Sequence, residues 1–340
     1  MIAERLTSQL LAGPSARDPV TVVRRLLAVQ GQDPRGARLA VRARSSGLSA
    51  IDVDRALSDD RSLLITWLNR GTLHLVRSED YPWLFTLTAP RLLAGNARRL
   101  AQEGVSPAAA ERGVSAIERS LAQDGPLTRE QLRERIATAG VRTEGQALVH
   151  LLMLASLRGL TVRGPMIGRQ QAYVLVKDWL EPSAPIDRDR ARAELARRYL
   201  AGHGPASERD LAKWAGVTLG DARAGLGAIA SELRTRKDGL VDLVKRPPTA
   251  ELPPPRLLGS FDPLLHGWTS REAVLGSHQG IVTVNGLFRP FALVGGRAVA
   301  TWSLSGNEIS LKPFGRLGSR EKAALDREAE DVLRYLAPRP

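Results

Sequence analysis

Two segments in the middle of the chain resemble each other, and this repeat restricts the possible folds more than any other feature. Each segment opens with a Gly-Pro pair and contains two hydroxyl residues that have Gln or Asp three positions later. This spacing predicts a capping box at the start of a helix, first a short helix and then a longer one with an apolar face. The four pairs are Thr128 with Gln131, Thr143 with Gln146, Ser207 with Asp210, and Thr218 with Asp221.

A short β-prone stretch closes each segment and predicts a two-stranded wing, with turns at Gly164 and at Asp238-Gly239. An amphipathic helix is predicted before each segment, at 110–122 and at 188–201. The order helix, helix, helix, wing is that of a winged helix-turn-helix, which the chain contains twice. The wing strands are predicted at 160–164 with 173–176, and at 233–236 with 240–244.

The N-terminal third fits the same plan and predicts a third winged-helix module. It contains three helix-like stretches and two β-prone stretches around the turn Asn69-Arg70-Gly71. The helices are predicted at 20–29, 34–44 and 51–57, and the hairpin at 63–68 with 72–76.

The last ninety residues change character after a Pro-rich linker at 246–255. A hairpin around Asn285-Gly286 and further strands at 291–294 and 298–302 are followed by a helix at 320–336. The expected fold is therefore α+β, with three tandem winged helix-turn-helix modules and a β-rich, barrel-like C-terminal region. The domains are predicted at 1–105, 106–182, 183–246 and 247–340.

The charge of the chain indicates a polyanionic partner. The 340 residues include 49 basic and 36 acidic ones, for a formal net charge of +13. Arginine far outnumbers lysine and provides a planar fork that suits phosphates and base edges. A GC-rich genome would explain the ratio of arginine to lysine without any function, but it does not explain the net excess.

The residue types present exclude several kinds of chemistry. There is no cysteine, which removes disulfides, thiolate metal sites and a cysteine nucleophile. The five histidines show no metal-ligand spacing, so we expect neither a metal nor another cofactor. The N-terminus lacks the apolar run of a signal peptide, and no stretch approaches a membrane span of about 20 apolar residues. We therefore expect a soluble, cytosolic protein that has no contact with membranes.

The pair Gln30 and Gln32 is the strongest candidate for a functional site. Residues at i and i+2 point to the same side of an extended segment, and Pro34 biases Asp33 away from helical geometry. An amide donates and accepts hydrogen bonds but does not titrate. The pair therefore suits a reaction whose leaving group is already activated. The alternative is that both are solvated loop glutamines, and Asp33 remains a candidate third participant.

Five stretches that span the whole chain carry a family resemblance: Gln30-Gly31-Gln32, residues 70–76, residues 257–262, residues 267–271 and residues 296–302. Through these motifs, which occur in the family's order, the chain resembles the AlkZ-like DNA glycosylases of the winged-helix superfamily. One departure is that Pro263 and Leu264 follow Phe261-Asp262, where the family commonly has an acidic and an aromatic residue.

The resemblance implies a monofunctional glycosylase that removes bulky alkylated purines and, in some members, unhooks interstrand crosslinks made by DNA-alkylating antibiotics. It assigns the catalytic role to Gln30 and Gln32. A purine alkylated at N7 is positively charged, so its glycosidic bond is weakened in advance and needs no general acid. We expect the partner to be double-stranded DNA that carries such purines, and the protein to act as a monomer in the bacterial cytoplasm, at the nucleoid.

Tandem winged helices would contact many phosphates, so we expect affinity for DNA to fall steeply with salt. His74 is equally well explained as a structural histidine, and five tryptophans are predicted to be packing residues, with Trp268 left open. The candidate DNA contacts are Arg35, Arg38, Arg42, Arg70, His74, Arg163, Arg169 and Lys237.

Two other functions remain open at the level of sequence. Winged helices occur most often in regulators, so the chain is alternatively a non-catalytic DNA-binding protein, either a transcription regulator or a drug-sequestering resistance factor. The other alternative, a scaffold for protein contacts, explains the positive charge poorly. The glutamine pair and the run of winged modules without a separate ligand-sensing domain favour the glycosylase.

Overall fold

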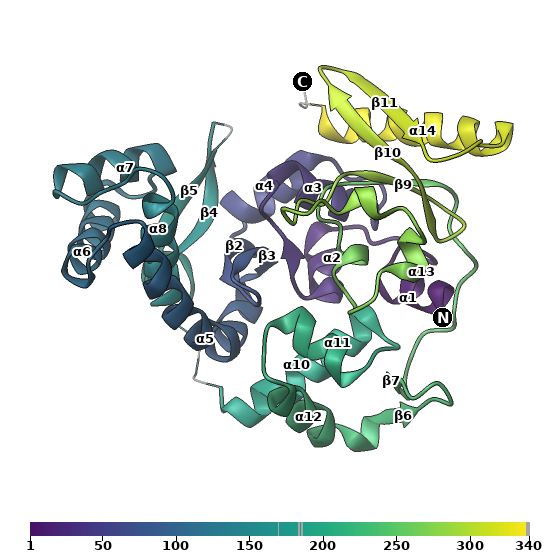
Figure 1. Cartoon of the computed structure of the whole chain (residues 1–340), viewed down its shortest axis with the longest axis horizontal. Coiled ribbons are helices and arrows are strands. Elements are labelled where there is room, and N and C mark those ends of the chain that lie inside the picture. The colour runs from purple at the N-terminus through teal and green to yellow at the C-terminus, as the bar shows by residue number, and fades with distance from the viewer. Residues whose placement is uncertain (169, 183, 185, 338–340) are drawn as a thin grey trace. The chain divides into compact units, whose positions relative to one another are not determined.

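The computed structural model describes residues 1–168, 170–182, 184 and 186–337 of the chain. Helices and strands are mixed throughout, which confirms the α+β class (Figure 1). The chain divides into two compact units: unit 1 comprises Met1–Val53 and Arg192–Pro340, and unit 2 comprises Asp54–Ala191. The four consecutive modules predicted above are a finer division, and their boundaries stay a prediction. None of the described helices is long and apolar enough to cross a membrane.

Unit 2 contains four antiparallel strands in the order β3-β2-β4-β5, with helices packed against them. The helix α4 (Ala50–Ser58) crosses the boundary between the two units. The other elements are β2 (Leu63–Leu68), β3 (Thr72–Arg77), α5 (Tyr81–Gln102), α6 (Pro107–Asp124), α7 (Arg129–Thr138), α8 (Ala147–Leu157), β4 (Thr161–Ile167), β5 (Gln170–Leu175) and α9 (Val176–Trp179).

Two local predictions in unit 2 are confirmed. The β2–β3 hairpin turns through Asn69 and Gly71, both with positive φ. The capping box of Thr128 and Gln131 opens α7, because each side chain accepts a hydrogen bond from the backbone N–H of the other residue.

Two other local predictions in unit 2 are wrong. The pair Thr143 and Gln146 forms no capping box: α8 begins at Ala147, and the N–H of Gln146 donates to Glu103 Oε2 at 3.0 Å instead. Gly164 is not the turn of the wing but lies inside β4, where a Cβ would stand 2.5 Å from the ring of Trp179. Burial against this ring decides the position of the glycine.

Unit 1 begins with α1 (Ile2–Ser8), α2 (Pro19–Leu26), β1 (Val29–Gln30) and α3 (Pro34–Arg42). It continues with α10 (Arg188–His203), which crosses the unit boundary, α11 (Glu208–Ala215), α12 (Leu219–Ala228) and the β6–β7 hairpin (Leu233–Thr235 and Val241–Leu243). Both predicted capping boxes are present, at Ser207 with Asp210 and at Thr218 with Asp221. The hairpin turns at Asp238-Gly239 as predicted.

The C-terminal part of unit 1 is an open antiparallel sheet in the order β11-β10-β9-β8, and no closed barrel is found among the described residues. The predicted hairpin around Asn285-Gly286 is reduced to a single bridge between Val282 and Phe288. The elements are β8 (Arg256–Leu258), α13 (Glu272–Leu275), β9 (Phe291–Val294), β10 (Arg297–Ser305), β11 (Glu308–Pro313) and α14 (Ser319–Leu336).

One hydrophobic cluster joins this sheet to the N-terminal helices. Leu39 of α3 packs with Leu257 of β8, Trp302 of β10 and Val332 of α14. Figure 1 shows α14 lying along the sheet strands that it covers. The cluster therefore attaches α3, which follows the glutamine pair, to the C-terminal sheet.

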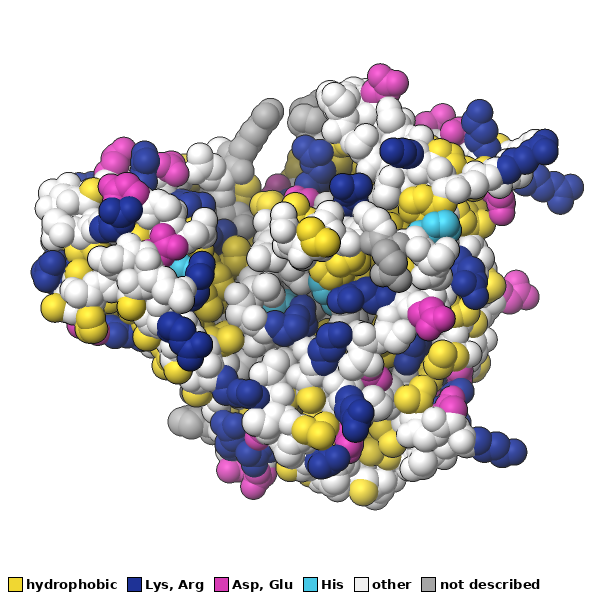
Figure 2. All heavy atoms as spheres, in the orientation of Figure 1, with side chains coloured by type: hydrophobic (Ala, Val, Ile, Leu, Met, Phe, Trp, Pro, Cys, Tyr) yellow, Lys and Arg dark blue, Asp and Glu magenta, His cyan; other side chains and the backbone are white. Residues whose placement is uncertain are grey.

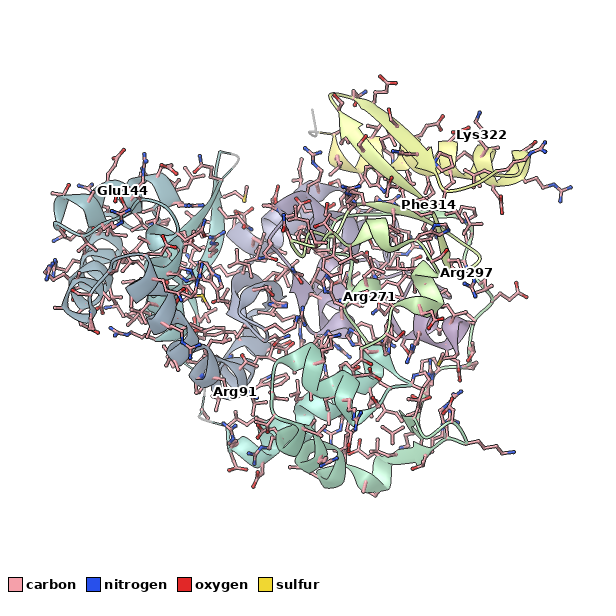
Figure 3. The ribbon with its side chains drawn as sticks, in the orientation of Figure 1. Arg91, Glu144, Arg271, Arg297, Phe314 and Lys322 are labelled. Atoms are coloured by element: carbon pink, nitrogen blue, oxygen red, sulfur yellow. The ribbon has the colours of Figure 1, made fainter. Side chains whose placement is uncertain are left out.

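The loop between β8 and β9 is also fixed from within. Arg271, labelled in Figure 3, donates from Nε to the carbonyl of Leu265 at 2.7 Å. Its guanidinium carbon lies 5.1 Å from the centre of the Phe288 ring. This cationic side chain thus holds two parts of the loop together.

Candidate active site

The two glutamines lie in a short extended connection between two helices. The predicted helix at 20–29 ends earlier, at Leu26, because Leu27 adopts a left-handed φ of 65° and redirects the chain. Such a conformation is costly for a branched side chain, and here complete burial of Leu27 maintains it. The chain then runs extended through Val29–Gln30 and enters α3 at Pro34.

The extended backbone places both amides on one side, as predicted. Gln30 Nε2 donates a hydrogen bond to Gln32 Oε1. Gln30 is 7% exposed, whereas Gln32 is exposed to solvent. The pair is therefore anchored at one end and open at the other, and it contains no group that titrates.

Asp33 has a structural task at this position. It is the N-cap of α3, and its Oδ1 accepts a hydrogen bond from the backbone N–H of Arg35 at 3.0 Å. A carboxylate at a helix N-terminus is stabilised by the unpaired N–H groups and by the helix dipole. The cap fixes the direction in which α3 leaves the glutamine pair.

A close crossing of two backbones holds the start of α3 in place. A Cβ on Gly36 would stand 2.4 Å from the carbonyl oxygen of Ser260, and a Cβ on Gly259 would stand 2.9 Å from Cβ of Leu39. Neither position has room for a side chain. Glycine at both positions lets α3 lie directly against the segment that follows β8.

A buried ion pair fixes the other end of α3. Arg44 donates to both carboxylate oxygens of Asp262, at 2.9 and 2.8 Å, and also to Gln9 Oε1 at 2.9 Å. Both charged side chains are 0% exposed. Asp262 belongs to the motif 257–262, so this motif serves to hold the helix beside the glutamines.

The sequence-based prediction that Arg42 contacts DNA needs correction. Arg42 is 4% exposed, and it donates to Glu328 at 2.7 Å, to Asp331 at 2.8 Å and to the carbonyl of Leu257 at 2.8 Å. Its charge is neutralised by α14, so the side chain belongs to the packing of α3.

Arg38 on the same helix is 7% exposed and donates to the carbonyl of Pro34 at 2.8 Å. Of the three arginines predicted on this helix, Arg35 is the exposed one.

A cavity of about 330 Å³ opens beside the glutamine motif. Its wall is formed by the start of α3 on one side and by the C-terminal sheet on the other. The lining residues are Asp33, Pro34, Arg35, Leu39, Ser260, Pro290, Trp302 and Leu304.

Two of the predicted contacts in unit 2, His74 and Arg163, pack against its sheet. His74 is 2% exposed, and burial, together with the nearby charge of Arg70, lowers its pKa to about 3. It is therefore a neutral structural histidine, the alternative that the sequence left open, and no surface contact to DNA follows from it. Arg163 donates to the hydroxyl of Tyr173 and lies over the ring of Trp67, with its guanidinium carbon 5.1 Å from the ring centre.

The remaining candidates differ in exposure. Arg70 is partly exposed, Lys237 in the β6–β7 turn is exposed, and Arg169 lies outside the described residues. All six tryptophans are at least nine-tenths buried, which confirms the packing role predicted for five of them and extends it to Trp268.

Sequence reasoning did not assign a positioning role to four residues: Gly36, Gly259, Arg44 and Asp262. One signal was available, because a glycine inside a helix pattern commonly marks a close backbone approach. The partnership of Arg44 with Asp262 joins positions 218 residues apart, and no local pattern indicates it.

An amide pair without a titratable partner, set in a positively charged α+β chain, fits a glycosylase that acts on an already activated base. The family model described as "DNA glycosylase AlkZ-like" matches residues 23–335, and the chain belongs to this family of DNA glycosylases. The family expected from the motifs is therefore confirmed.

A curated protein and a solved structure, both from Streptomyces sahachiroi, are similar to the chain. A curated relative named "Interstrand DNA cross-link repair glycosylase" is 29% identical over 352 residues, covering 94% of this chain and 91% of the relative. The solved structure of "Streptomyces sahachiroi DNA glycosylase AlkZ" has a TM-score of 0.78 and 25% sequence identity, covering 98% of this chain and 95% of that one.

Proposed function

We propose that the protein hydrolyses the N-glycosidic bond of bulky alkylated purines in duplex DNA, including N7-alkylguanines and interstrand crosslinks, with Gln30 and Gln32 as its catalytic residues. The observation that carries this proposal is the hydrogen-bonded amide pair in the extended segment before α3. The name of the relative in Streptomyces sahachiroi, a cross-link repair glycosylase, supports the choice of substrate. In the cell, the reaction would confer resistance to DNA-alkylating agents.

The chemistry of the substrate explains why two amides suffice. An N7-alkylated purine leaves as a neutral base, so the bond to the sugar breaks without protonation by an acid. The protein then has to position a water molecule on the anomeric carbon and stabilise the developing oxocarbenium charge. Amide oxygens are suited to both tasks, since they accept hydrogen bonds and carry partial negative charge. The products are the free base and an abasic site.

The wider DNA contacts are also part of the proposal. We infer that α6, α7, α8 and the β4–β5 hairpin form one winged-helix module, and that α10, α11, α12 and the β6–β7 hairpin form another. Figure 2 shows Lys and Arg side chains spread across the face drawn, as expected for a protein that follows a phosphate backbone. Arg35, Arg70 and Lys237 are retained as contacts, and the protein is proposed to act as a cytoplasmic monomer at the nucleoid.

The test uses a labelled duplex with one N7-methylguanine and a second duplex with a bulkier N7 adduct. Base release is detected as an alkali-dependent strand break at the modified position. We expect a break with the wild-type protein and no break with Gln32→Ala, which lacks one of the two catalytic amides. Because Gln32 is exposed, its truncation should leave the fold intact, so the loss reports on the reaction.

The matched control is Gln102→Ala, which removes an amide at the end of α5, outside the site. Gln102→Ala should cleave like the wild-type protein, and Gln32→Ala should keep wild-type affinity for the duplex. Equal losses of affinity and of base release in Gln32→Ala would make the pair a docking element and would overturn its catalytic role.

A further inference from the structure

A second cavity in unit 1, separate from the glutamine site, is lined largely by positive charge. It has a volume of about 530 Å³ and lies between the C-terminal ends of α2 and α10 and the segment that follows β7. Five cationic side chains and one carboxylate line it: Arg24, Arg25, Arg198, Lys245, Arg246 and Asp242. The function derived above uses none of them.

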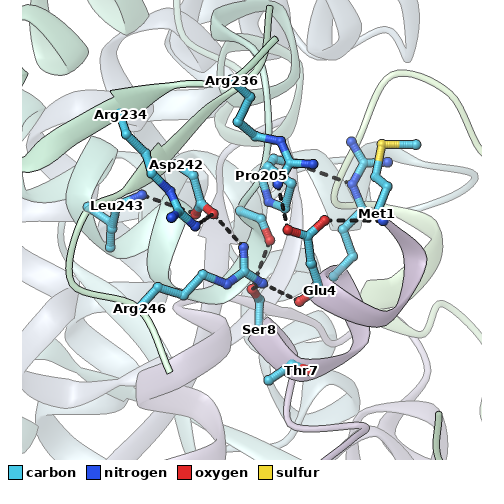
Figure 4. A network of polar contacts seen from close by, with 12 residues as sticks. Met1, Glu4, Thr7, Ser8, Pro205, Arg234, Arg236, Asp242, Leu243 and Arg246 are labelled. Atoms are coloured by element: carbon cyan, nitrogen blue, oxygen red, sulfur yellow. Dashed lines mark hydrogen bonds and ion pairs between the residues drawn. The ribbon is translucent and has the colours of Figure 1, made fainter. Parts of the chain in front are cut away.

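The single carboxylate is already neutralised. Asp242 is 1% exposed and is bound by Arg246 at 2.7 Å and by Arg234 at 3.2 Å. Figure 4 shows Arg246 extending from Asp242 to Ser8 and to the backbone of Glu4. Arg246 therefore fixes the wall of the cavity. Of the other cations, Arg198 pairs with Glu194 at 3.6 Å, and no second carboxylate is among the residues that line the cavity.

Two of the cations that line the cavity are exposed and available to a ligand. Within the described part of the chain, the side chains of Arg24 and Lys245 form no hydrogen bond or ion pair, and both are exposed. Arg25 donates to the carbonyl of Ala201 at 3.5 Å. Burial, and then repulsion from Arg24 and Arg246, lowers the pKa of Arg25, so a bound anion would relieve this repulsion.

The geometry of the cavity is fixed by the packing of two helices. A Cβ on Gly202 of α10 would stand 2.2 Å from the carbonyl oxygen of Arg25. The helices therefore meet at backbone distance, and this contact fixes the backbone of Arg24 and Arg25 beside α10. The two guanidinium groups thus start from fixed positions, and their planar donors match the oxygens of a phosphate.

We propose that this cavity binds a backbone phosphate of the DNA whose modified base is at the glutamine pair. Gln30 follows Arg25 by five positions. At about 3.6 Å per residue their Cα atoms are therefore at most about 18 Å apart. A DNA strand rises about 3.4 Å per nucleotide. The Cα separation therefore corresponds to about five nucleotides, and the lengths of the Arg and Gln side chains at its two ends add a few more. The cavity thus sets the register of the strand relative to Gln30 and Gln32.

The test compares two double variants that each remove two positive charges from exposed positions. Arg24→Gln with Lys245→Gln changes the cavity, and Lys312→Gln with Lys322→Gln changes β11 and α14. Affinity for an undamaged duplex is measured from low to high salt. Losing one phosphate contact should lower the slope of log K against log salt by about 0.9, which corresponds to about fivefold weaker binding at 0.15 M salt. The control variant should keep the wild-type slope.

The phosphate site rests on the proposed function, because that function places the lesion at Gln30 and Gln32. The outcomes of the test nevertheless distinguish the two. Equal slopes in the wild-type protein and in Arg24→Gln with Lys245→Gln overturn the phosphate site, even if base release continues. An equal fall in both double variants assigns the effect to overall charge and also overturns it. Saturable binding of inorganic phosphate together with an unchanged DNA slope would make the cavity a site for a small phosphate anion. Loss of base release in Gln32→Ala tests the proposed function alone.

Discussion

The close crossing at Gly36 makes a prediction that links packing to catalysis. Gly36→Ala adds one methyl group to α3, and this carbon would stand 2.4 Å from the carbonyl oxygen of Ser260 and 3.3 Å from Asp33 Oδ2. Since the nearest atom is backbone, it does not rotate away. The helix must therefore move with respect to the segment after β8, and the glutamine pair is joined to the end that moves.

Two opposing effects set the change in the free energy of unfolding caused by Gly36→Ala. Alanine in place of glycine inside a helix gains about 0.5–1 kcal/mol, and overpacking of a well-packed interior costs about 1–3 kcal/mol. Gly227 in α12 is the matched control, because it lies in the same unit and its added Cβ would meet no atom within 4 Å. Gly227→Ala should stabilise the protein, and the two variants should differ in free energy of unfolding by about 1–3 kcal/mol.

The assay is urea unfolding together with single-turnover base release from the N7-methylguanine duplex. A displacement of about 1 Å near the reacting groups reduces rates by roughly 100-fold, so Gly36→Ala should release the base at least tenfold more slowly than Gly227→Ala under folded conditions. If Gly36→Ala were as stable as Gly227→Ala and released the base at the wild-type rate, the crossing would be looser than the structure shows, and the reasoning would fail.

Two further predictions concern buried charges. His74 has a folded pKa of about 3 against an ordinary value of 6.5, so the unfolded chain takes up its proton first as pH falls. Protonation of His74 should therefore leave the free energy of unfolding unchanged above about pH 6.5. Below that pH it should lower the free energy of unfolding by up to about 1.4 kcal/mol per pH unit towards pH 3. Comparing urea unfolding of wild-type and His74→Gln between pH 7 and pH 4 checks this, and identical pH slopes would refute it. Asp262→Asn should cost about 3–5 kcal/mol because it leaves Arg44 charged and buried, while Arg44→Met with Asp262→Leu should cost less. A double-mutant cycle with Arg44→Met and Asp262→Leu measures the coupling free energy between the two side chains. Additive losses of stability would count against a buried ion pair.

Features that depend on a few neighbouring residues were predictable from the sequence. The capping boxes at Thr128, Ser207 and Thr218 are hydrogen bonds between residues three positions apart, so the pattern contains all the partners. The pair at Thr143 failed because Glu103, 43 residues away, binds the N–H of Gln146 first. Local patterns identify groups that are able to bond, and the fold decides which of them meet.

The arginines of α3 show the same limit. Arg35, Arg38 and Arg42 form one face of the predicted helix and are equivalent as sequence, yet only Arg35 is exposed in the structure. Arg42 pairs with Glu328, 286 residues away. Nothing near Arg42 in the chain distinguishes a guanidinium that meets a carboxylate of α14 from one that meets a phosphate.

The sequence by itself determined the mixed fold class, the family and the amide pair, because these depend on periodicity, on turn residues and on a short motif whose two members lie on one side of an extended segment. The tertiary structure alone decided how that segment is held and which charges remain available. The crossing of Gly36 with Ser260, the pairing of Arg44 with Asp262 and the cationic cavity beside α2 each join positions far apart in the chain. Burial of one partner by the other is a property of the folded chain, and no local segment contains it.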